Sequence, residues 1–461
     1  MGQSLSAVSF RDPAGFVYCQ EGDLRRQINQ VYRAHYDHLL SSGLYDELTD
    51  ERLLIEHAEI ETEPLDPSHA YKVIRPERIE FVSYPYEWCF SQLQDAALLT
   101  LEVQRRAVLR GMTLKDCSVY NLQFREGRPI FIDTLSFEIQ RDGAPWTGYR
   151  QFCEHFLAPL ALQSLTDYRL AQLCRTNIDG IPLDLASRLL PWRSRLRFGL
   201  GVHIHLHSAL QRSHSKEVPP SQGRDMSRRA LLGLVDNLES TVRGLRQKPR
   251  GTAWSSYYDK NSYTPEEFQR KARLVAEFLA RTQSSTVWDL GANAGYFSLL
   301  AAKRGLSTIA FDYDPACVER TYREVKERKE TRLLPLILDL FNPSPPSGWK
   351  NQERAAIFER GKPELVMALA LVHHLAFTGN QPLYNLAAFF NELSPWLVIE
   401  FVPEDDPQSQ LLIAQRRGVH HPYHRSHFEE SFGKHFTIID SETVSRSGRA
   451  LYLMRRHSDD R

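Results

Sequence analysis

The sequence lacks a long hydrophobic run and an excess of either charge. No uninterrupted apolar stretch among its 461 residues approaches the ~20 residues of a membrane-spanning helix, so we expect no membrane partner. The N-terminus lacks the basic and then apolar layout of a secretory signal. Lysine plus arginine and aspartate plus glutamate both number 57, so no net positive field would attract nucleic acid.

Cysteine is also scarce, and its six residues are scattered without a Cys-x-x-Cys pair. This spacing excludes a zinc ribbon and a disulfide framework, so we expect no metal site and a cytoplasmic protein. The six are Cys19, Cys89, Cys117, Cys153, Cys174 and Cys317.

A chain of this length predicts more than one domain, and its charge pattern locates a divide. Residues 186–250 hold thirteen lysines and arginines against four acids, and residues 231–245 have the apolar spacing of a helix. We therefore predict an N-terminal domain over 1–185, a basic and partly helical connector over 186–250, and a C-terminal domain over 251–461. The basic charge would either meet an anionic partner or form a solvated face, which is the commoner case.

The C-terminal domain alternates helices with short apolar strands. Residues 264–283 begin with a capping box, the signature of a helix start. Near-continuous apolar strands between helices indicate a parallel sheet covered on both faces, and two final runs could form a hairpin. We predict an α/β fold with a doubly wound, mostly parallel seven-stranded sheet. Its first five strands are expected within 285–290, 307–315, 333–341, 364–375 and 395–403.

A glycine-containing turn joins the first of these strands to a helix. Gly291 and Gly295 suit backbone conformations that other residues resist, and Asn293 is among the residues that tolerate a left-handed backbone. Asp289 precedes the turn, and Asp312 ends the next strand seventeen residues after Gly295. An acid at that place can accept both hydroxyls of a ribose.

These segments resemble the class I S-adenosylmethionine-dependent methyltransferases, with a Rossmann-like sheet, over residues 251–461. The matching motifs are DLGANAG, AFDYD, LILDLF and ELVMALALVHHL. The resemblance implies that Asp289, Gly291, Asn293 and Gly295 surround the methionine end of the cofactor, while Asp312 binds its ribose. A dehydrogenase would require Gly-x-Gly-x-x-Gly in the first turn, which this spacing fits poorly.

The resemblance also implies two further contributions to the cofactor site. Asp339, in the third strand, would lie near the adenine amine. The segment WSSYYDKNSYTPEEFQRK, in front of the first strand, is similar to one found in a subset of these enzymes. Its polar and aromatic residues would either cover the cofactor pocket, Tyr258 among them, or pack the helix against the sheet. They are Tyr257, Tyr258, Asn261 and Tyr263.

A histidine pair follows the fourth strand, where the family's acceptor would approach the methyl group. One of His373 and His374 could accept the acceptor's proton at neutral pH. Alternatively, one of them hydrogen-bonds a carbonyl while the other lines the wall. Glu400, near the end of the fifth strand, is a second acid candidate.

Two other histidine groups invite a metal interpretation that the sequence does not favour. The run with His420, His421, His424 and His427 has no acidic ligand or HxxxH helix context, so we expect a loop over the substrate. The segment 203–207 alternates histidines as one face of a strand would, again without Cys or Asp partners.

The N-terminal half contains acids in a regular order. Asp116, Asn121 and Asp133 follow an apolar helix that ends at Gly111, and residues 122–133 predict a hairpin with Glu-Gly at its turn. This arrangement resembles the catalytic loop and metal-binding acid of protein-kinase-like folds. A plain structural role for these acids, in turns and caps, fits equally well.

The kinase resemblance departs from the family pattern in several places. Leu114-Lys115 replaces the usual His-Arg, Asp133-Thr134-Leu135 replaces Asp-Phe-Gly, and no glycine-rich phosphate loop is visible. Lys72 is the only lysine in a plausible strand. We therefore interpret residues 1–185 as an α+β domain. It either has a kinase-like scaffold without phosphotransfer or uses these acids only in turns and caps.

Both halves together resemble a bacterial family of nodulation-associated proteins described as methyltransferases. The sequence therefore predicts methyl transfer from S-adenosylmethionine to a small-molecule or glycan-type acceptor. The alternatives are a non-catalytic protein that retains the cofactor fold, and phosphotransfer by the N-terminal half. The acceptor atom and the oligomeric state stay open.

Overall fold

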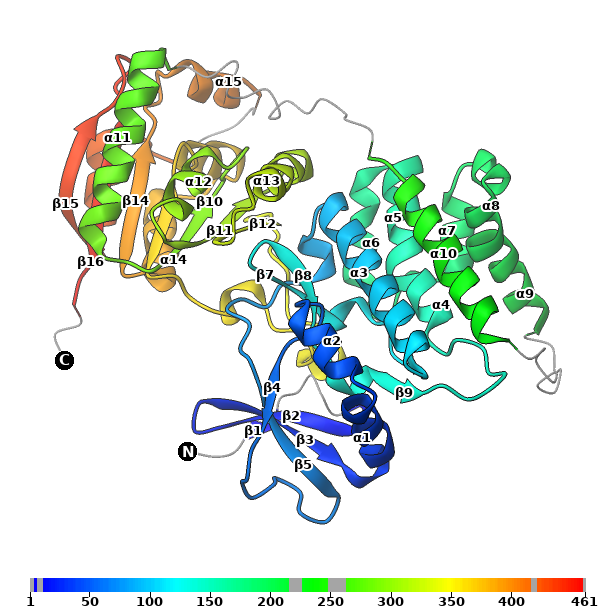
Figure 1. Cartoon of the computed structure of the whole chain (residues 1–461). Coiled ribbons are helices and arrows are strands. Elements are labelled where there is room, and N and C mark those ends of the chain that lie inside the picture. Colours follow the sequence, from blue (N-terminus) through cyan, green and yellow to red (C-terminus); the bar gives the residue numbers. More distant parts are fainter. Residues whose placement is uncertain (1–3, 6–10, 215–225, 248–262, 416–420, 459–461) are drawn as a thin grey trace. The chain divides into compact units, whose positions relative to one another are not determined.

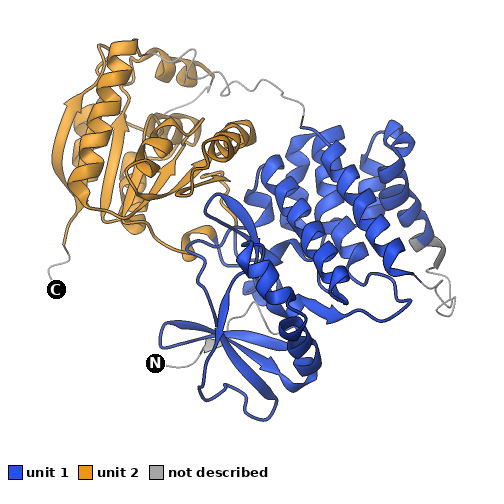
Figure 2. Cartoon of the chain, in the orientation of Figure 1, with its two compact units in different colours: residues 1–248, 345–356 blue, residues 249–344, 357–461 orange. Residues whose placement is uncertain are grey.

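The chain divides into two compact units. The computed structural model describes residues 4–5, 11–214, 226–247, 263–415 and 421–458 (Figure 1). Unit 1 comprises residues 1–248 and 345–356, and unit 2 comprises residues 249–344 and 357–461 (Figure 2). No helix within the described ranges combines the length and the hydropathy that crossing a membrane requires.

Unit 1 begins with a five-stranded antiparallel sheet in the order β1-β2-β3-β5-β4. Its apolar core contains Ile28, Tyr32 and Tyr36, which are all buried. The elements are β1 (Ser4–Leu5), β2 (Gly15–Gln20), β3 (Asp23–Asn29), α1 (Arg33–Ser41), α2 (Leu44–Asp50), β4 (His57–Glu59) and β5 (Ala70–Pro76).

The rest of unit 1 is mainly helical, and the expected hairpin is part of it. The turn residues Glu126 and Gly127 have φ of 50° and 74°, as a two-residue hairpin turn requires. The elements are α3 (Phe90–Leu109), β6 (Met112–Leu114), β7 (Leu122–Arg125), β8 (Arg128–Phe131), β9 (Phe137–Ile139), α4 (Tyr149–Phe152), α5 (Ala158–Leu165), α6 (Leu173–Thr176), α7 (Leu183–Leu189), α8 (Phe198–Leu200), α9 (His207–His214) and α10 (Arg228–Gly244).

The segment expected as a connector, 186–250, packs within unit 1 as far as it is described. The helix expected over 231–245 is α10, and it lies along α3 (Figure 1). Gln94 donates a hydrogen bond to the carbonyl of Val242 at 2.8 Å, and Arg105 pairs with Glu239 at 2.6 Å. The boundary at 185 therefore does not separate two compact units, because contacts distant in sequence fix α10 to α3.

Unit 2 is built on a seven-stranded sheet in the order β12-β11-β10-β13-β14-β16-β15. The first five strands are parallel, and β16 and β15 are antiparallel to their neighbours. This confirms the predicted doubly wound, mostly parallel sheet with a terminal hairpin. The strands are β10 (Thr286–Leu290), β11 (Ser307–Asp312), β12 (Leu333–Ile337), β13 (Leu365–Ala368), β14 (Trp396–Phe401), β15 (Phe436–Thr443) and β16 (Ala450–Arg456).

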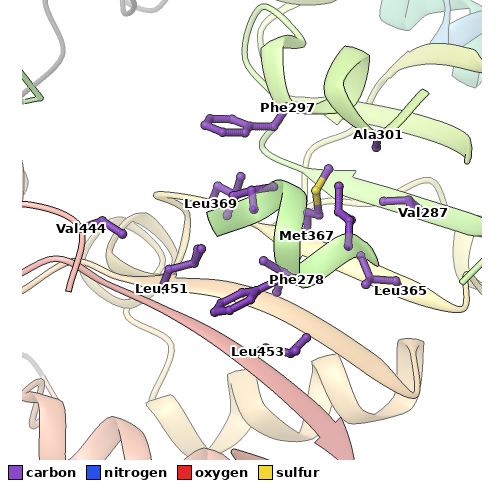
Figure 3. Close-up of a cluster of buried hydrophobic side chains, with 13 residues drawn as sticks. Phe278, Val287, Phe297, Ala301, Leu365, Met367, Leu369, Val444, Leu451 and Leu453 are labelled. Atoms are coloured by element: carbon purple, nitrogen blue, oxygen red, sulfur yellow. The ribbon is translucent and has the colours of Figure 1, made fainter. Parts of the chain in front are cut away.

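Helices cover the sheet of unit 2. Side chains from α11 meet Val287 of β10 and Leu451 and Leu453 of β16 in one apolar cluster, whose members include Phe278 and Phe297 (Figure 3). Elsewhere, the ring of Phe401 lies 5.1 Å from that of Phe428 in α16. The helices are α11 (Pro265–Thr282), α12 (Tyr296–Ala302), α13 (Pro315–Arg328), α14 (Leu383–Leu393), α15 (Pro407–Gln415) and α16 (Arg425–Gly433).

Two expected strands are wrong in part or in full. The strand expected over 364–375 ends at Ala368, because Ala370 takes a left-handed φ of 50° and a π-helical turn, His374–Thr378, follows. The segment 203–207 is helical, with a π-helix over Gly201–Leu206. Its histidines are spaced so that His203 and His207 both contact the ring of Tyr149, as residues i and i+4 of a helix can.

Candidate functional site

The bend between β10 and α12 depends on three residues with left-handed backbone. Gly291, Asn293 and Gly295 have φ of 76°, 51° and 74°. A Cβ on Gly295 would lie 2.6 Å from Cγ2 of Thr321, so both the backbone conformation and the lack of space disfavour a side chain at this position. Asn293 takes the same backbone region, which explains why it can stand where a glycine is common.

Asp289 lies at the end of β10 and is buried. The hydroxyl of Ser298 in α12 donates to its Oδ2 at 2.6 Å, which ties the strand to the helix across the bend. Burial raises the pKa of Asp289 to about 7; the Ser298 hydrogen bond opposes this shift, and the charge of Asp312 adds to it. This carboxyl group therefore titrates near neutral pH.

Asp312 ends β11 and faces the bend. Its Oδ2 accepts the backbone N–H of Asn293 at 2.7 Å, and its Oδ1 accepts that of Asp314 at 2.8 Å. Burial raises the pKa of Asp312 to about 6 against these two hydrogen bonds. The structure thus brings together two residues, Asn293 and Asp312, that sequence reasoning assigned to one cofactor.

Asp339 was expected in the third strand, but β12 ends at Ile337, so Asp339 lies two residues beyond the strand that pairs with β11. Its Oδ1 accepts the backbone N–H of Phe341 at 2.9 Å, which shapes the turn after the strand. Tyr258 lies outside the described residues, as do Tyr257 and Asn261.

His373 and His374 lie after β13, near the bend. Leu371, two residues before His373, has its Cδ1 3.1 Å from the place of a Cβ on Gly291. The two imidazole rings are 4.2 Å apart, and His373 is 1% exposed. Nδ1 of His373 has no hydrogen-bond partner within the described part of the chain.

Both imidazoles are neutral at physiological pH. Burial lowers the pKa of His374 to about 4, with a smaller effect of the Arg449 charge. Burial also lowers the pKa of His373, and the charges of His374 and Arg449 lower it further. Neutral imidazole is the form that can accept a proton, but the burial that keeps both rings neutral also weakens them as bases.

A buried charge cluster lies beside the histidines. Lys271 of α11 donates to Oε2 of Glu400 at 2.6 Å, and the hydroxyl of Tyr263 donates to Oε1. Arg449 forms two hydrogen bonds of 2.8 Å with Asp406 and lies 3.8 Å from Glu400. Tyr263 therefore packs α11 against the sheet.

Glu400, an acid candidate in the sequence, is committed to this cluster. Burial alone would raise the pKa of Glu400, but the charges of Lys271 and Arg449 hold it below its usual range. An acid with two buried cationic partners does not serve as a proton acceptor. Sequence reasoning missed Lys271, although its place on the buried face of α11, four residues before Val275, was a signal for a buried lysine.

The acids of unit 1 have structural partners. Asp133 forms an ion pair with Arg26 of β3 and caps the following turn by accepting the N–H of Leu135 at 2.9 Å. Asp116 accepts the N–H of Ser118 at 2.9 Å. Asn121 donates to the hydroxyl of Ser136 at 3.0 Å. These contacts match the expectation of turn and cap residues, and Lys72 pairs with Glu59 at 2.6 Å.

The described residues contain no group of three or more His, Cys, Asp or Glu side chains arranged to hold a metal ion. His424 caps α16 by accepting the N–H of His427 at 3.1 Å, so this part of the histidine run begins a helix. His420 lies outside the described residues. His203 instead links Tyr149 and Asn237 through hydrogen bonds of 2.7 Å.

Comparison with known proteins gives one relative at high coverage. The nodulation protein NoeA of Rhizobium meliloti strain 1021 is 33% identical over 459 residues, which span 98% of this chain and 96% of NoeA. No protein-family model matches the sequence.

The solved structures that match part of this chain include methyltransferases. Magnesium protoporphyrin IX methyltransferase ChlM of Synechocystis PCC 6803, with bound SAH, is 16% identical, covering 41% of this chain and 84% of ChlM with a TM-score of 0.31. The bifunctional kinase-methyltransferase WbdD is 14% identical, covering 44% of this chain and 42% of WbdD with a TM-score of 0.33. At these TM-scores neither likeness bears on the function of this chain.

Proposed function

We propose that this chain, which belongs to the NoeA family of nodulation proteins, transfers a methyl group from S-adenosylmethionine to a small-molecule or glycan-type acceptor. The observation that carries the proposal is the glycine bend after β10, hydrogen-bonded to a carboxylate at the end of β11. In the sheet, β10 lies between β11 and β13, where the strand order reverses. Open α/β sheets bind ligands outside the carboxyl ends of their strands at this point. With all six cysteines free, we also propose a cytoplasmic location.

The residues around the bend fit the cofactor. Each oxygen of the Asp312 carboxylate accepts one backbone N–H, and each carboxylate oxygen can accept about two hydrogen bonds. One acceptor site on each oxygen therefore remains for the two hydroxyls of a ribose. Asp339 would lie toward the adenine. Asp289, Gly291, Asn293 and Gly295 would surround the methionine end, and Tyr258 stays a predicted contact.

The histidine pair fits the proton transfer. When bound, S-adenosylmethionine supplies a methyl group on a positively charged sulfur. One neutral imidazole of the pair accepts the proton that a hydroxyl or amine acceptor loses as its oxygen or nitrogen bonds the methyl carbon. The cofactor would leave as S-adenosylhomocysteine, whose sulfur would keep the electron pair of the carbon–sulfur bond. The chain's main contribution is to hold the two reactants in line.

Calorimetric titration with S-adenosylmethionine tests the cofactor site. Asp312→Ala should weaken binding at least tenfold, since each hydrogen bond to a charged group contributes ~1.5–3 kcal/mol. Asp440→Ala on β15 is the matched control, because Asp440 pairs with Arg281 at the partly exposed surface and should bind like wild type. Equal affinity of Asp312→Ala and wild type would remove the proposal.

Product formation separates an enzyme from a binding protein. Wild type should release S-adenosylhomocysteine when offered pools of hydroxyl and amine acceptors. His374→Ala should keep its cofactor affinity and lose most of this release. A protein that binds the cofactor but forms no product with any pool would instead match the non-catalytic alternative.

A further inference from the structure

One sequence segment of unit 1 exposes six large apolar side chains. They all come from residues 189–210, which run from the end of α7 through α8 into α9. In Figure 1, these helices lie at one end of the helical part of unit 1. The exposed residues are Leu189 at 37%, Trp192 at 68%, Leu196 at 76%, Phe198 at 74%, Leu206 at 53% and Leu210 at 49%.

Arginines alternate with these apolar residues. Residues 188–210 contain four arginines and no acidic residue, and all four arginines are exposed. Arg188 pairs with Asp184 at 3.2 Å. Within the described residues, no ion pair involves the other three, Arg193, Arg195 and Arg197. We call residues 188–210 the basic apolar surface.

The backbone below this surface is firmly held, so the exposure is a property of the fold. Ser194 is buried, and its hydroxyl donates to the carbonyl of Pro191 at 2.7 Å. The same hydroxyl lies 2.7 Å from Nε2 of His205, whose Nδ1 lies 2.8 Å from the hydroxyl of Ser187. Leu190 and Leu200 are buried on either side. These inward contacts leave Trp192, Leu196 and Phe198 outside.

Single exposed apolar residues are ordinary, but a cluster of six within 22 residues is not. Tryptophan prefers the boundary between water and lipid, leucine and phenylalanine enter the acyl region, and arginine binds phosphate in a bidentate manner. Arginine near an anionic membrane also gains from the negative surface potential. A nucleic acid would match the arginines but not the exposed leucines.

We propose that the basic apolar surface binds the face of a membrane that contains anionic phospholipids. This departs from the expectation of no membrane partner, which rested on the absence of a spanning segment. A surface-bound protein needs only apolar side chains that reach the headgroup boundary together with attractive charge. The proposal does not depend on the methyl-transfer activity.

Vesicle co-sedimentation of the full chain tests the proposal. Wild type should bind vesicles of phosphatidylcholine with 30% phosphatidylglycerol at least tenfold more tightly than vesicles of phosphatidylcholine alone, and high salt should weaken the binding. Trp192→Ser combined with Phe198→Ser should reduce binding at least tenfold. Trp349→Ser is the matched control, because Trp349 is 62% exposed in unit 1 but outside the surface.

A second variant tests the charge without touching the apolar residues. Arg193→Gln, Arg195→Gln and Arg197→Gln together change only exposed side chains, so the fold should be retained and confirmed by circular dichroism. This triple variant should lose the preference for anionic vesicles. Absence of wild-type binding, or equal binding by both variants and wild type, would overturn the proposal. The proposal would also be overturned if wild type fails to bind vesicles but self-associates or retains nucleic acid, and the variants lose that property. The surface would then bind a second copy of the chain or a nucleic acid instead.

Discussion

At the scale of single residues, Asp312 links cofactor affinity to pH. Its pKa of about 6 lies above the value of ~3.9 for an exposed aspartate, and only the ionised carboxylate can accept both ribose hydroxyls. The contribution of Asp312 to the affinity for S-adenosylmethionine should therefore be level at pH 7–8 and fall below pH 6, approaching tenfold per pH unit. Calorimetric titration from pH 5 to pH 8 measures this slope.

Two variants identify the group responsible for that slope. Asp312→Asn should bind weakly at every pH and lose the dependence near pH 6. Asp289→Asn should keep the dependence near pH 6, because it leaves the Asp312 carboxylate and its two backbone hydrogen bonds in place. A wild-type affinity that stays constant from pH 5 to pH 8 would contradict the role given to Asp312.

Asp289 predicts a pH dependence of stability with the opposite sign to that of a salt-bridged acid. Because burial raises its folded pKa to about 7, the folded chain binds this proton more tightly than the unfolded chain does. The contribution of Asp289 to the free energy of unfolding is therefore complete below pH ~4 and falls as the pH rises to about 7. Asp289→Asn keeps an acceptor for Ser298 and removes the titration.

Urea unfolding at pH 5 and pH 8 measures this effect. The free energy of unfolding of Asp289→Asn minus that of wild type should be larger at pH 8 than at pH 5. Ser298→Ala is the control for the hydrogen bond alone, and it should lose ~1 kcal/mol at pH 5. A constant difference between Asp289→Asn and wild type at both pH values would show that Asp289 titrates in its ordinary range.

At the scale of elements, short sequence motifs predicted the helix starts and turns that depend only on neighbouring residues. The capping box of Thr264 and Glu267 begins α11 where expected, and Glu126-Gly127 forms the predicted hairpin turn. The strand over 364–375 was overextended because an apolar run does not reveal the left-handed φ at Ala370 that ends it. The buried pair of Lys271 and Glu400 joins α11 to β14, a contact that only the folded sheet brings about.

Two glycines with left-handed backbone, Gly295 in the bend and Gly305 after α12, should lose different amounts of stability when replaced by alanine. Gly305 has a φ of 86° with open space around it, so Gly305→Ala should cost only the ~1 kcal/mol of a left-handed alanine. Gly295→Ala adds the close approach to Thr321 and should cost clearly more, ~2 kcal/mol or above. Urea unfolding of both variants measures the difference.

A double variant shows whether Thr321 causes the extra cost. Thr321→Ser removes Cγ2, the atom nearest to the added Cβ, and keeps the hydroxyl that bonds to the carbonyl of Cys317 at 3.0 Å. Combined with Gly295→Ala, it should recover part of the lost stability. Independent, additive effects of the two changes would mean that Thr321 does not limit the bend.

At the scale of the whole molecule, the sequence placed the divide near 250 but missed a crossing of the chain. Residues 345–356 lie between β12 and β13 in sequence, yet they belong to unit 1. Arg11 pairs with Glu353 at 2.7 Å, and Arg354 lies 4.0 Å from the ring centre of Tyr120. Contacts between residues more than 200 positions apart produce no periodic pattern in the sequence, so the sequence alone does not predict them.

The division into two units predicts a selective response to the cofactor in scanning calorimetry. All residues of the proposed cofactor site belong to unit 2, and a ligand stabilises only the unit that binds it. S-adenosylmethionine at 100 times its dissociation constant adds ~2.7 kcal/mol to unit 2, which should raise the midpoint of one transition by several degrees. The transition of unit 1 should stay in place, and Asp312→Ala should abolish the shift. A single transition that moves as a whole would mean that the two units unfold together, since the chain passes between them at 248, 345 and 356.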